Sequence, residues 1–337
     1  MRSSPTSPPW PSARWHDVIG WIAVLLLPGV VGVVTERADW CPDRIVAAVQ
    51  LLLPWWGGLA LVVTVVGLVA AEVWLVVAGA IVVVGVAVVT GPKLLRGRRA
   101  RPSSPSETRF SVGLANLYID NEEPDAAARQ LLEAAPTILV LTELTPDLLD
   151  AFDAAGGSDR YPHRLHREPL EGEYEAGIFS VHAFAAAKVH TEGDLRVVDA
   201  TVALPDGEVR VVAVHPEAPT SHDGFRTWRR QLRALRGLLA QAEPATIALG
   251  DFNAGTLQPP YEALLHTPFR DAHDLMGQAL APSWGTGPSL PRWVPALVAR
   301  LDHLLVGPSI SVIEIRNLDA VGSDHEPFVA DLALLDT

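Results

Sequence analysis

The sequence predicts an α/β protein in two parts: three transmembrane helices, followed by a sandwich of two packed sheets flanked by helices. Apolar residues make up 49% of the 337, and their surplus lies almost wholly before residue 91, in runs long enough to cross a bilayer. After residue 108, short apolar runs alternate with helical patterns. Many strand candidates beside only a few helices are typical of packed sheets.

The first part divides into predicted spans at about residues 18–34, 45–71 and 73–90. No charged residue lies in the first span, and Glu72 is the only one between Ile45 and Thr90. Because a charge is costly at the centre of a bilayer, we place Glu72 in a tight turn between the second and third spans. These lengths predict a multi-pass plasma-membrane protein with the lipid bilayer as a partner.

Two alternatives remain for these spans. The first could be a cleaved signal peptide, since Arg2 and Arg14 precede it, although no small-x-small cleavage site follows. Residues 45–71 contain Gln50, Pro54 and two adjacent tryptophans, so they could include an interfacial segment.

The two parts differ in charge. Residues 1–100 contain eight Lys and Arg against five acidic residues, which leaves 18 basic and 34 acidic residues in 101–337, a net charge of −16. A domain this acidic repels a long polyanion unless metal ions or a local basic groove intervene, so nucleic acid is a disfavoured partner. The single cysteine, Cys41, cannot form an intramolecular disulfide and is predicted to be a free thiol with no role. We infer no protein partner.

The second part is predicted to cover residues 108–337, after a basic, Pro/Ser-rich juxtamembrane linker at 92–107. Helices are predicted at 125–135, 146–155 and 225–241, the last with Trp228, Leu232 and Leu235 in the core. The strand candidates are 109–118, 137–144, 175–181, 195–204, 208–215, 245–252, 301–307, 312–321 and 328–335.

Polar residues recur where these strands end, which is where α/β folds place their sites. They are Asn116, Glu143, His215, Asp251 with Asn253, Asp302, and Asp324 with His325. Each one alone is better explained as a cap or turn residue. Their recurrence indicates one site.

The stretch GDFNA, residues 250–254, places two candidate catalytic side chains, Asp251 and Asn253, close together. An extended backbone turns Asp251 and Asn253 to one side and Phe252 to the other, where it can anchor the loop in the core. A carboxylate can orient or deprotonate water, and an amide can donate to a phosphoryl oxygen, which together suit hydrolysis of a phosphate ester. The structural alternative is an Asx-turn.

Glu143 offers a hard oxygen ligand of the kind that Mg²⁺ takes, and the metal would act as a Lewis acid on the phosphoryl group. His325, beside Asp324, supplies a donor that titrates near neutral pH. A further carboxylate such as Asp302 could hold the ring of His325 in the useful tautomer.

In order along the chain, Asn116, LTELT, EAGIFS, VAVHPEAP, GDFNA, RLDHLLV and GSDHEP resemble the motifs of the endonuclease/exonuclease/phosphatase superfamily, over about residues 108–335. The resemblance implies a DNase I-like, four-layer αββα sandwich. It also implies Mg²⁺-dependent hydrolysis of phosphoester or phosphoanhydride bonds, with Mn²⁺ as the alternative metal.

The resemblance also implies roles for the residues. Glu143, Asn116 and Asp324 match metal-site residues, Asp251 the water-orienting or general-base aspartate, Asn253 and His215 the residues that bind the scissile phosphate, and Asp302 with His325 the carboxylate–histidine pair that stabilises the transition state. The chain departs from the pattern at His182, where relatives often have an arginine, and at Val214, where they often have an asparagine. Both departures concern substrate contacts.

Three spans before such a domain are similar to the VanJ-type membrane proteins of actinobacteria, linked to glycopeptide (teicoplanin) resistance. That likeness implies an extracytoplasmic catalytic domain acting on lipid-linked pyrophosphate, such as undecaprenyl pyrophosphate. The basic cluster from Lys93 to Arg101 favours a cytoplasmic domain instead. Trp284 and Trp293 lie on a Pro/Gly-rich loop that either contacts lipid or substrate or packs the loop.

The leading hypothesis is a membrane-anchored, Mg²⁺-dependent phosphohydrolase with a lipid-linked or small phosphorylated substrate. The alternatives are a membrane-tethered surface nuclease of the same superfamily and a non-catalytic protein that binds the cell envelope.

Overall fold

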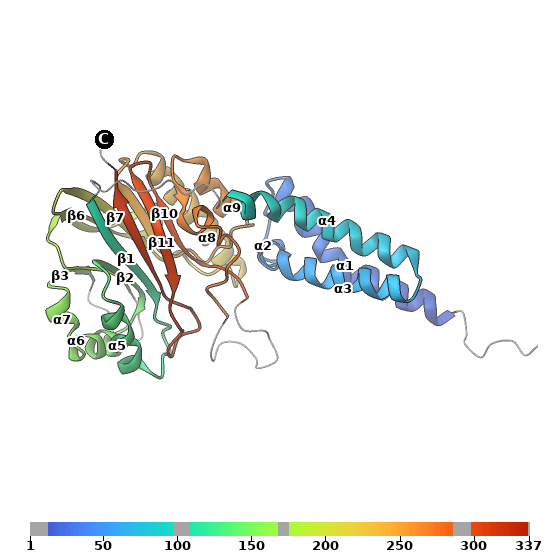
Figure 1. Cartoon of the computed structure of the whole chain (residues 1–337), viewed down its shortest axis with the longest axis horizontal. Coiled ribbons are helices and arrows are strands. Elements are labelled where there is room, and N and C mark those ends of the chain that lie inside the picture. The colour runs from blue at the N-terminus through green and yellow to red at the C-terminus, as the bar shows by residue number, and fades with distance from the viewer. Residues whose placement is uncertain (1–12, 97–107, 168–174, 286–297, 336–337) are drawn as a thin grey trace, which may run out of the picture.

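The computed structural model describes residues 13–96, 108–167, 175–285 and 298–335. A bundle of helices projects from one end of an α/β sandwich (Figure 1). The helices of the bundle are α1 (Ala13–Arg37), α2 (Arg44–Leu51), α3 (Leu53–Val69) and α4 (Val73–Arg96). The bundle and the sandwich are therefore built from the two parts that the sequence predicts.

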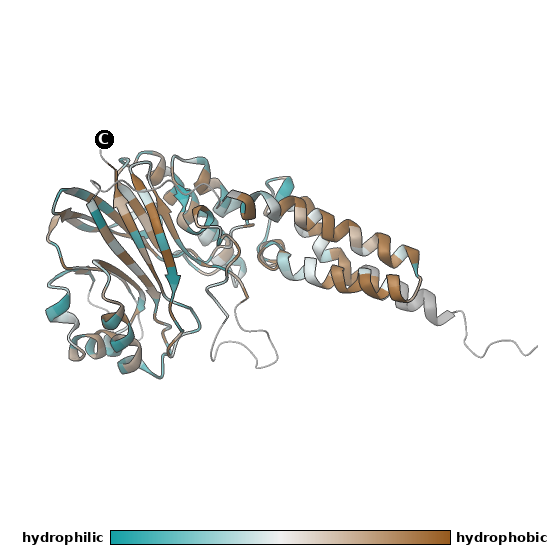
Figure 2. Ribbon diagram, viewed as in Figure 1, coloured by the Kyte–Doolittle hydropathy of each residue, from teal (hydrophilic) through white to brown (hydrophobic). Residues whose placement is uncertain are grey.

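The bundle is apolar both inside and on its surface. Leu53, Ala60 and Val82 pack in its interior. Figure 2 shows that α3 and α4 are mostly apolar, and many of their apolar residues are exposed. Helices α3 and α4 approach closely at Gly79, where a side chain would lie 2.3 Å from Thr64 Oγ1. Glu72 lies in the turn between α3 and α4, as predicted.

The second predicted span is two helices, so the prediction of one continuous span over 45–71 is wrong. Helices α2 and α3 meet at Leu52 with a bend of 63°. Pro54 has no N–H to continue the hydrogen-bond ladder of α2, which accounts for the break. The interfacial alternative for this segment matches the short, separate α2.

Among the described residues, one helix is long and apolar enough to cross a membrane, at Val73–Leu95 in α4. The bent pair α2–α3 adds a second only if the two helices are taken as one broken span. Three crossings stay a prediction. Helix α4 also continues beyond the expected end of the span to Arg96, and its Lys93 forms an ion pair with Glu262 of the sandwich. The remainder of the predicted linker, 97–107, lies outside the described residues.

The sandwich contains two six-stranded mixed sheets. The first has the order β11-β12-β1-β2-β4-β3 and the second β5-β6-β7-β8-β10-β9, with β1 parallel to β2 and β7 parallel to β8. The strands are β1 (Thr108–Asn116), β2 (Ile138–Leu144), β3 (His163–His166), β4 (Glu175–Ser180), β5 (Phe184–Glu192), β6 (Leu195–Leu204), β7 (Gly207–Val214), β8 (Thr246–Asp251), β9 (Arg270–Asp271), β10 (Asp302–Val306), β11 (Ile310–Asn317) and β12 (Phe328–Leu334).

Helices cover the outer faces of both sheets. They are α5 (Pro124–Ala134), α6 (Pro146–Ala154) and α7 (Gly157–Arg160) beside the first sheet, and α8 (His222–Ala240), α9 (Pro259–Glu262), the 3₁₀ helix η2 (Ala263–His266) and α10 (Ala272–Leu275) beside the second. Trp228, Leu232 and Leu235 of α8 are buried, as predicted. The arrangement is an α/β, DNase I-like sandwich.

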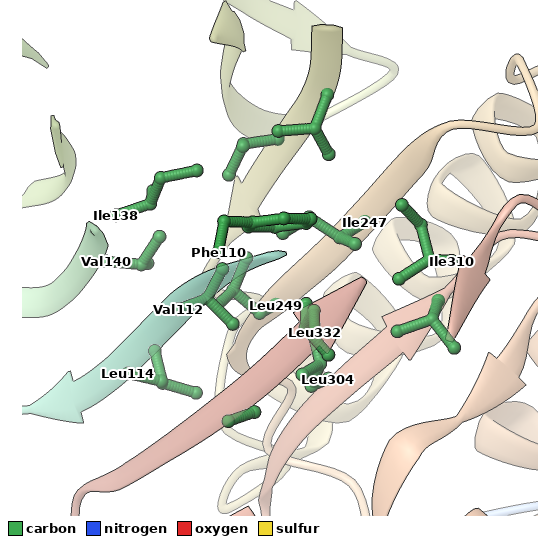
Figure 3. Close-up of a cluster of buried hydrophobic side chains, with 14 of the residues drawn as sticks. Phe110, Val112, Leu114, Ile138, Val140, Ile247, Leu249, Leu304, Ile310 and Leu332 are labelled. Carbon is green, nitrogen blue, oxygen red and sulfur yellow. The ribbon is translucent and has the colours of Figure 1, made fainter. Parts of the chain in front are cut away.

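The core lies between the two sheets. Figure 3 shows Phe110, Val112 and Val140 from the first sheet facing Ile247 and Leu249 of the second. Three strands, β3, β5 and β9, escape sequence prediction. The reasons are physical: β3 and β9 are too short to show periodicity, and β5 is largely exposed and alanine-rich, so it has no alternation of apolar and polar residues.

The bundle packs directly on the sandwich. Leu257 of the sandwich lies in the apolar core of the bundle, and Cys41 and Ala47 of the bundle lie in the core beneath α8. Gln258 Nε2 donates to Ala47 O at 2.8 Å, and Trp55 Nε1 donates to Val298 O at 2.9 Å. Burial raises the pKa of the Cys41 thiol to about 12, so the thiol is protonated at neutral pH.

Candidate active site

Strand topology brings the predicted polar residues to one edge of the sandwich. Asn116 ends β1, Glu143 lies at the penultimate position of β2, and His215 directly follows β7. Asp251 ends β8, and the antiparallel β10 places Asp302 opposite it in register. Asp324 and His325 come from the segment before β12. All eight predicted site residues therefore lie around this edge, because Asn253 follows Asp251 by two positions.

Asn116 links the two carboxylates at the centre of the site. Its Nδ2 donates to Glu143 Oε1 at 2.9 Å and to Asp251 Oδ2 at 3.0 Å, while its Oδ1 accepts from Tyr118 N at 3.0 Å. Glu143 Oε2 accepts from Ile119 N at 2.8 Å. With the amide nitrogen facing both carboxylates, Asn116 braces the pair in this arrangement.

The GDFNA loop has the predicted orientation. Phe252 is fully buried, its carbonyl accepts from Trp228 Nε1 at 3.2 Å, and Asp251 and Asn253 face the site. Asn253 takes a left-handed φ of 49°, and its N–H donates to Asp251 Oδ1 at 2.8 Å, so the Asx-turn is present as well. The turn fixes the position of the carboxylate, and the structural and functional interpretations are compatible.

His215 and Asn253 lie together beside the carboxylates. Asn253 Nδ2 is 3.4 Å from His215 Nε2 and donates to Pro216 O at 3.0 Å. His215 Nε2 is 3.6 Å from Asp251 Oδ2 and 3.8 Å from Glu143 Oε1. His215 and Asn253 therefore border the carboxylates of Glu143 and Asp251.

His325 lies between two carboxylates. Its Nδ1 is 2.6 Å from Asp302 Oδ2, and its Nε2 is 3.7 Å from Asp251 Oδ2. Ser283 Oγ donates to the same Asp302 oxygen at 2.7 Å, which fixes that carboxylate behind the ring. Because Asp251 and Asp302 are opposite each other across β8 and β10, the imidazole offsets the repulsion between them.

Charge sets the protonation states of these groups. Burial alone would lower the pKa of His325, but the charges of Asp302 and Asp251 raise it to about 10. Burial would raise the pKa of Asp251, yet His325 and His215 lower it to about 2. Burial also lowers the pKa of His215, but the hydrogen bond to Asp251 together with the charges of Asp251 and Glu143 outweighs it, so the net shift is upward. At neutral pH the site therefore holds an ionised Asp251 beside an imidazolium at His325.

The donor atoms fit a divalent cation. Ligand atoms of Glu143, His215 and Asp251 lie within 4.8 Å of one another, and so do those of Asp251, Asp302 and His325. Carboxylate oxygens are the ligands that hard cations take. Asp302 Oδ1 is buried and has no hydrogen-bond partner among the described residues. Among the described residues, Asp324 is in neither of these two ligand groups. Its Oδ2 accepts a hydrogen bond from Trp284 Nε1 at 3.0 Å.

The cluster opens into a cavity of about 730 Å³. Four carboxylates line it, from Glu143, Glu217, Asp251 and Asp324, and Arg44 is the single Lys or Arg among the described lining residues. An anionic phosphate entering such a cavity is repelled unless a bound cation offsets the negative charge. The charge of the cavity is thus a second, independent indication of a metal site.

Part of the cavity wall comes from the bundle, which the sequence does not predict. Arg44, Ile45, Ala48 and Leu51 of α2 line the cavity together with His215 and His325. Ser283 is also missed, because a lone serine in a loop carries no distinguishing pattern. Of the two tryptophans singled out, Trp284 lines the cavity, and Trp293 lies outside the described residues.

The two departures from the motif pattern, His182 and Val214, contribute nothing to the lining of the cavity. Val214 is fully buried in the core beneath α8. The His182 N–H donates to Ser180 Oγ at 3.0 Å, so its backbone is held by the end of β4.

Solved structures of the same fold come from several organisms. An endonuclease/exonuclease/phosphatase from Beutenbergia cavernae is 20% identical, with a TM-score of 0.54 over 68% of this chain and 72% of that one. A family protein from Bacteroides thetaiotaomicron is 15% identical, with a TM-score of 0.53 over 69% and 100%. TDP2 from D. rerio, solved with a single-strand DNA product, is 17% identical, with a TM-score of 0.53 over 66% and 98%.

At these identities the likeness shows the fold alone. No curated protein matches the chain. The family model described as the endonuclease/exonuclease/phosphatase family matches residues 113–325, from β1 to His325 of the cluster. The chain belongs to the endonuclease/exonuclease/phosphatase family.

Proposed function

We propose that the chain is a membrane-anchored, divalent-metal-dependent phosphohydrolase that cleaves a phosphoester or pyrophosphate bond in a lipid-linked substrate. The observation that carries the proposal is the convergence of Glu143, Asp251 and His325 on one cavity beside the helical bundle. The family consists of metal-dependent hydrolases of phosphoester bonds, and the cavity contains groups suited to that reaction.

Asp251 is the group that orients the attacking water. It is ionised at neutral pH, and the Asn253 N–H holds one of its oxygens at 2.8 Å, so the other faces the cluster. A carboxylate in this state accepts a hydrogen bond from water and aims its oxygen at phosphorus. The P–O bond to the leaving group then breaks as the new P–O bond forms, and the water proton passes to solvent or to the leaving group.

His325 and its neighbours stabilise the charge that develops on the phosphoryl oxygens. Because Asp302 holds Nδ1, the protonated ring presents its Nε2–H toward the cavity. His215 and the Asn253 amide are placed to donate to the same phosphate. Fixed donors aimed at the charge of the transition state are among the largest contributions to catalysis.

The metal would be held first by Glu143 and Asp251, with His215 beside them. Mg²⁺ fits oxygen donors best, with Mn²⁺ as the alternative. A bound divalent cation supplies Lewis-acid polarisation of the phosphoryl group. Asn116 braces the two carboxylates, and Asp324 borders the cavity as a further acidic group.

Phosphate release tests the proposal. Purified protein in detergent, given Mg²⁺ and undecaprenyl pyrophosphate, is expected to release inorganic phosphate, and chelation by EDTA or the Asp251→Ala substitution is expected to abolish the release. Arg316→Ala, on an exposed part of β11, is the matched control and retains activity. Folded protein that releases no phosphate, where a related enzyme does so in the same assay, contradicts the proposal.

A membrane-tethered nuclease is the second candidate. It is favoured by the shared fold of TDP2 from D. rerio, which was solved with a single-strand DNA product. The net charge of −16 in residues 101–337 opposes it. Degradation of plasmid DNA that EDTA and Asp251→Ala both abolish would place the nuclease ahead of the lipid phosphohydrolase. Loss of a cellular phenotype in the same variant, with folding and insertion intact, would exclude a non-catalytic role.

We place the catalytic domain outside the plasma membrane, where lipid-linked envelope intermediates are exposed. The resemblance in layout supports this side, and the basic cluster from Lys93 to Arg101 opposes it. A reporter fused after Thr337 decides: activity of a periplasmic-type or secreted reporter supports the outer location, whereas activity of a cytoplasmic reporter reverses it.

A further inference from the structure

Helix α2 presents an apolar face to the catalytic cavity. Ile45, Ala48 and Leu51 are spaced by three residues, which places them along one side of the helix, and all three line the cavity. Ala47, one turn before Leu51, is buried and also lines the cavity, while the buried Gln50 does not line it. Apart from Arg44, the exposed residues of α2 are the apolar Ile45 and Ala48, whereas a soluble surface helix exposes mainly polar residues.

The apolar face is open rather than packed. Ile45 is 68% exposed although it lines the same cavity as His215 and Asp251. Ala218 and Pro219, from the loop after β7, add further apolar surface to the cavity. A cavity with a polar, catalytic end and an apolar wall suits an amphiphilic ligand.

The position of α2 against the catalytic loop is fixed by several contacts. Gln258 accepts from Gly255 N at 2.6 Å and donates to Ala47 O at 2.8 Å, so it joins the end of the GDFNA loop to α2. A side chain at Gly255 would lie 2.4 Å from Leu51 Cδ1, so this glycine permits the close approach. Arg44 Nη1 donates to Thr220 O at 3.0 Å and ties α2 to the loop after β7.

Exposed tryptophans lie on either side of α2. Trp40, just before the helix, is 57% exposed, and Trp55, just after it, is 44% exposed. Tryptophans gather at the boundary between the hydrocarbon and water of a membrane. Helices α3 and α4 also carry many exposed apolar residues. These features are typical of a segment at the boundary of a bilayer, the level at which a lipid chain leaves the hydrocarbon.

We propose that α2 is a substrate-binding element: the apolar chain next to the scissile phosphate lies along Ile45, Ala48 and Leu51, and Arg44 attracts the phosphate into an otherwise acidic cavity. The inference rests on the proposed phosphohydrolase function and makes the bundle part of the substrate site as well as an anchor. Its occupant is the hydrocarbon chain of a phosphorylated lipid, because the cavity is continuous from the catalytic cluster to this face.

Two substrates with the same head group test it. Undecaprenyl pyrophosphate carries a long apolar chain and isopentenyl pyrophosphate a short one, and both are given with Mg²⁺ to the full-length protein in lipid nanodiscs. For Ile45→Asn, the ratio of kcat/KM for the long chain to that for the short chain is expected to fall about tenfold, mainly through KM. Ala48→Asn is the second variant and is expected to act in the same direction.

Leu95→Asn is the matched control, because Leu95 is an exposed apolar residue at the same end of the bundle and does not line the cavity. Its ratio is expected to stay within about twofold of the unaltered protein. An unchanged ratio in both α2 variants, or an equal fall in the control, overturns the inference while leaving the phosphohydrolase function in place.

A binding measurement separates the two proposals if neither substrate is hydrolysed, an outcome that counts against the phosphohydrolase function. Farnesyl phosphate and methyl phosphate are titrated by calorimetry into the unaltered protein in nanodiscs with Mg²⁺. Tighter binding of farnesyl phosphate that Ile45→Asn weakens about tenfold supports the subsite. Equal binding of the two ligands, or binding that Ile45→Asn does not change, overturns it.

Discussion

Asp302 and His303 are adjacent in β10, and each is half of a different buried carboxylate–histidine pair. Asp302 faces the cavity side and contacts His325 Nδ1 at 2.6 Å. His303 points the opposite way, and its Nδ1 lies 3.1 Å from Asp271 Oδ2. Burial does not distinguish the pairs, because all four residues are at most 5% exposed. The difference lies in the second nitrogen of each ring.

In the Asp271–His303 pair, which we call the core pair, both ring nitrogens and both carboxylate oxygens have hydrogen-bond partners. His303 Nε2 is 2.7 Å from Ala254 O, and Asp271 also accepts from Tyr261 OH and, at 2.8 Å, from His273 N. In the Asp302–His325 pair, which we call the cavity pair, His325 Nε2 faces the cavity and lies 3.7 Å from Asp251 Oδ2. A carboxylate–histidine pair can act on a substrate only where the ring nitrogen that does not contact the carboxylate can reach that substrate. We therefore assign catalysis to Asp302–His325 and support of the GDFNA loop to Asp271–His303.

Asp302→Asn should have the largest effect on activity. It removes the charge that keeps His325 protonated and oriented, and loss of such a positioned acid lowers kcat by about 10²–10⁴-fold. Phosphate release from the proposed substrate gives kcat, and circular dichroism should show that the variant is folded at the assay temperature. Full activity in this variant would contradict the assignment of catalysis to Asp302–His325.

Asp271→Asn should act on stability instead. It leaves the His303 ring buried without its charge partner, and breaking a buried pair in this way costs about 3–5 kcal/mol. Urea unfolding gives the loss of stability, and kcat of the two asparagine variants at a temperature where both are folded measures the contrast. A core variant that unfolds like the unaltered protein, but has lost its turnover at low temperature, would reverse the assignment of the two pairs.

The pH dependence of stability should come from the cavity pair. The pKa of His325 is raised from 6.5 to about 10, so its contribution to the free energy of unfolding is complete below about pH 6.5 and is lost as the pH rises to about 10. The loss is up to about 1.4 kcal/mol per pH unit within that window. Urea unfolding in EDTA at pH 7, 8 and 9 should show this slope, and a flatter one in His325→Gln; equal slopes in the two proteins contradict the account.

The supporting hydroxyls should give the smallest effects and sharpen the same contrast. Ser283→Ala removes one hydrogen bond to Asp302, and we expect a fall in kcat of about tenfold with little change in Tm. Tyr261→Phe removes the donor to Asp271, and we expect a loss of about 1–3 kcal/mol of stability with kcat nearly unchanged. Tm and kcat are measured for both variants. Equal changes in the two quantities would show that the two pairs do not differ in role.

The sequence identifies the cavity pair more readily than the core pair. Asp302, Asp251 and His325 fall at strand ends in ordered motifs, so their convergence can be inferred. Asp271 lies in a two-residue strand and gives no such signal. Periodicity does locate the long strands and α8, because one face of each is buried.

The role of α2 could not be predicted for a different reason. Ile45 and Ala48 belong to an apolar run that looks uniformly lipid-facing, and only the 63° bend turns that run toward the catalytic cavity. Pro54 breaks the helix, but the direction of the bend depends on packing between segments remote in sequence, such as Leu51 against Gly255. Hydropathy records the chemistry of the residues but not the direction in which the helix turns.

Binding of Mn²⁺, followed by electron paramagnetic resonance, tests the central claim that these distant groups form one cation site. The account predicts about one tightly bound Mn²⁺ per chain, displaced by Mg²⁺, lost in Glu143→Gln with Asp251→Asn, and retained in Asp271→Asn at a temperature where that variant is folded. Binding that survives the loss of Glu143 and Asp251, or its absence from the unaltered protein, would contradict it.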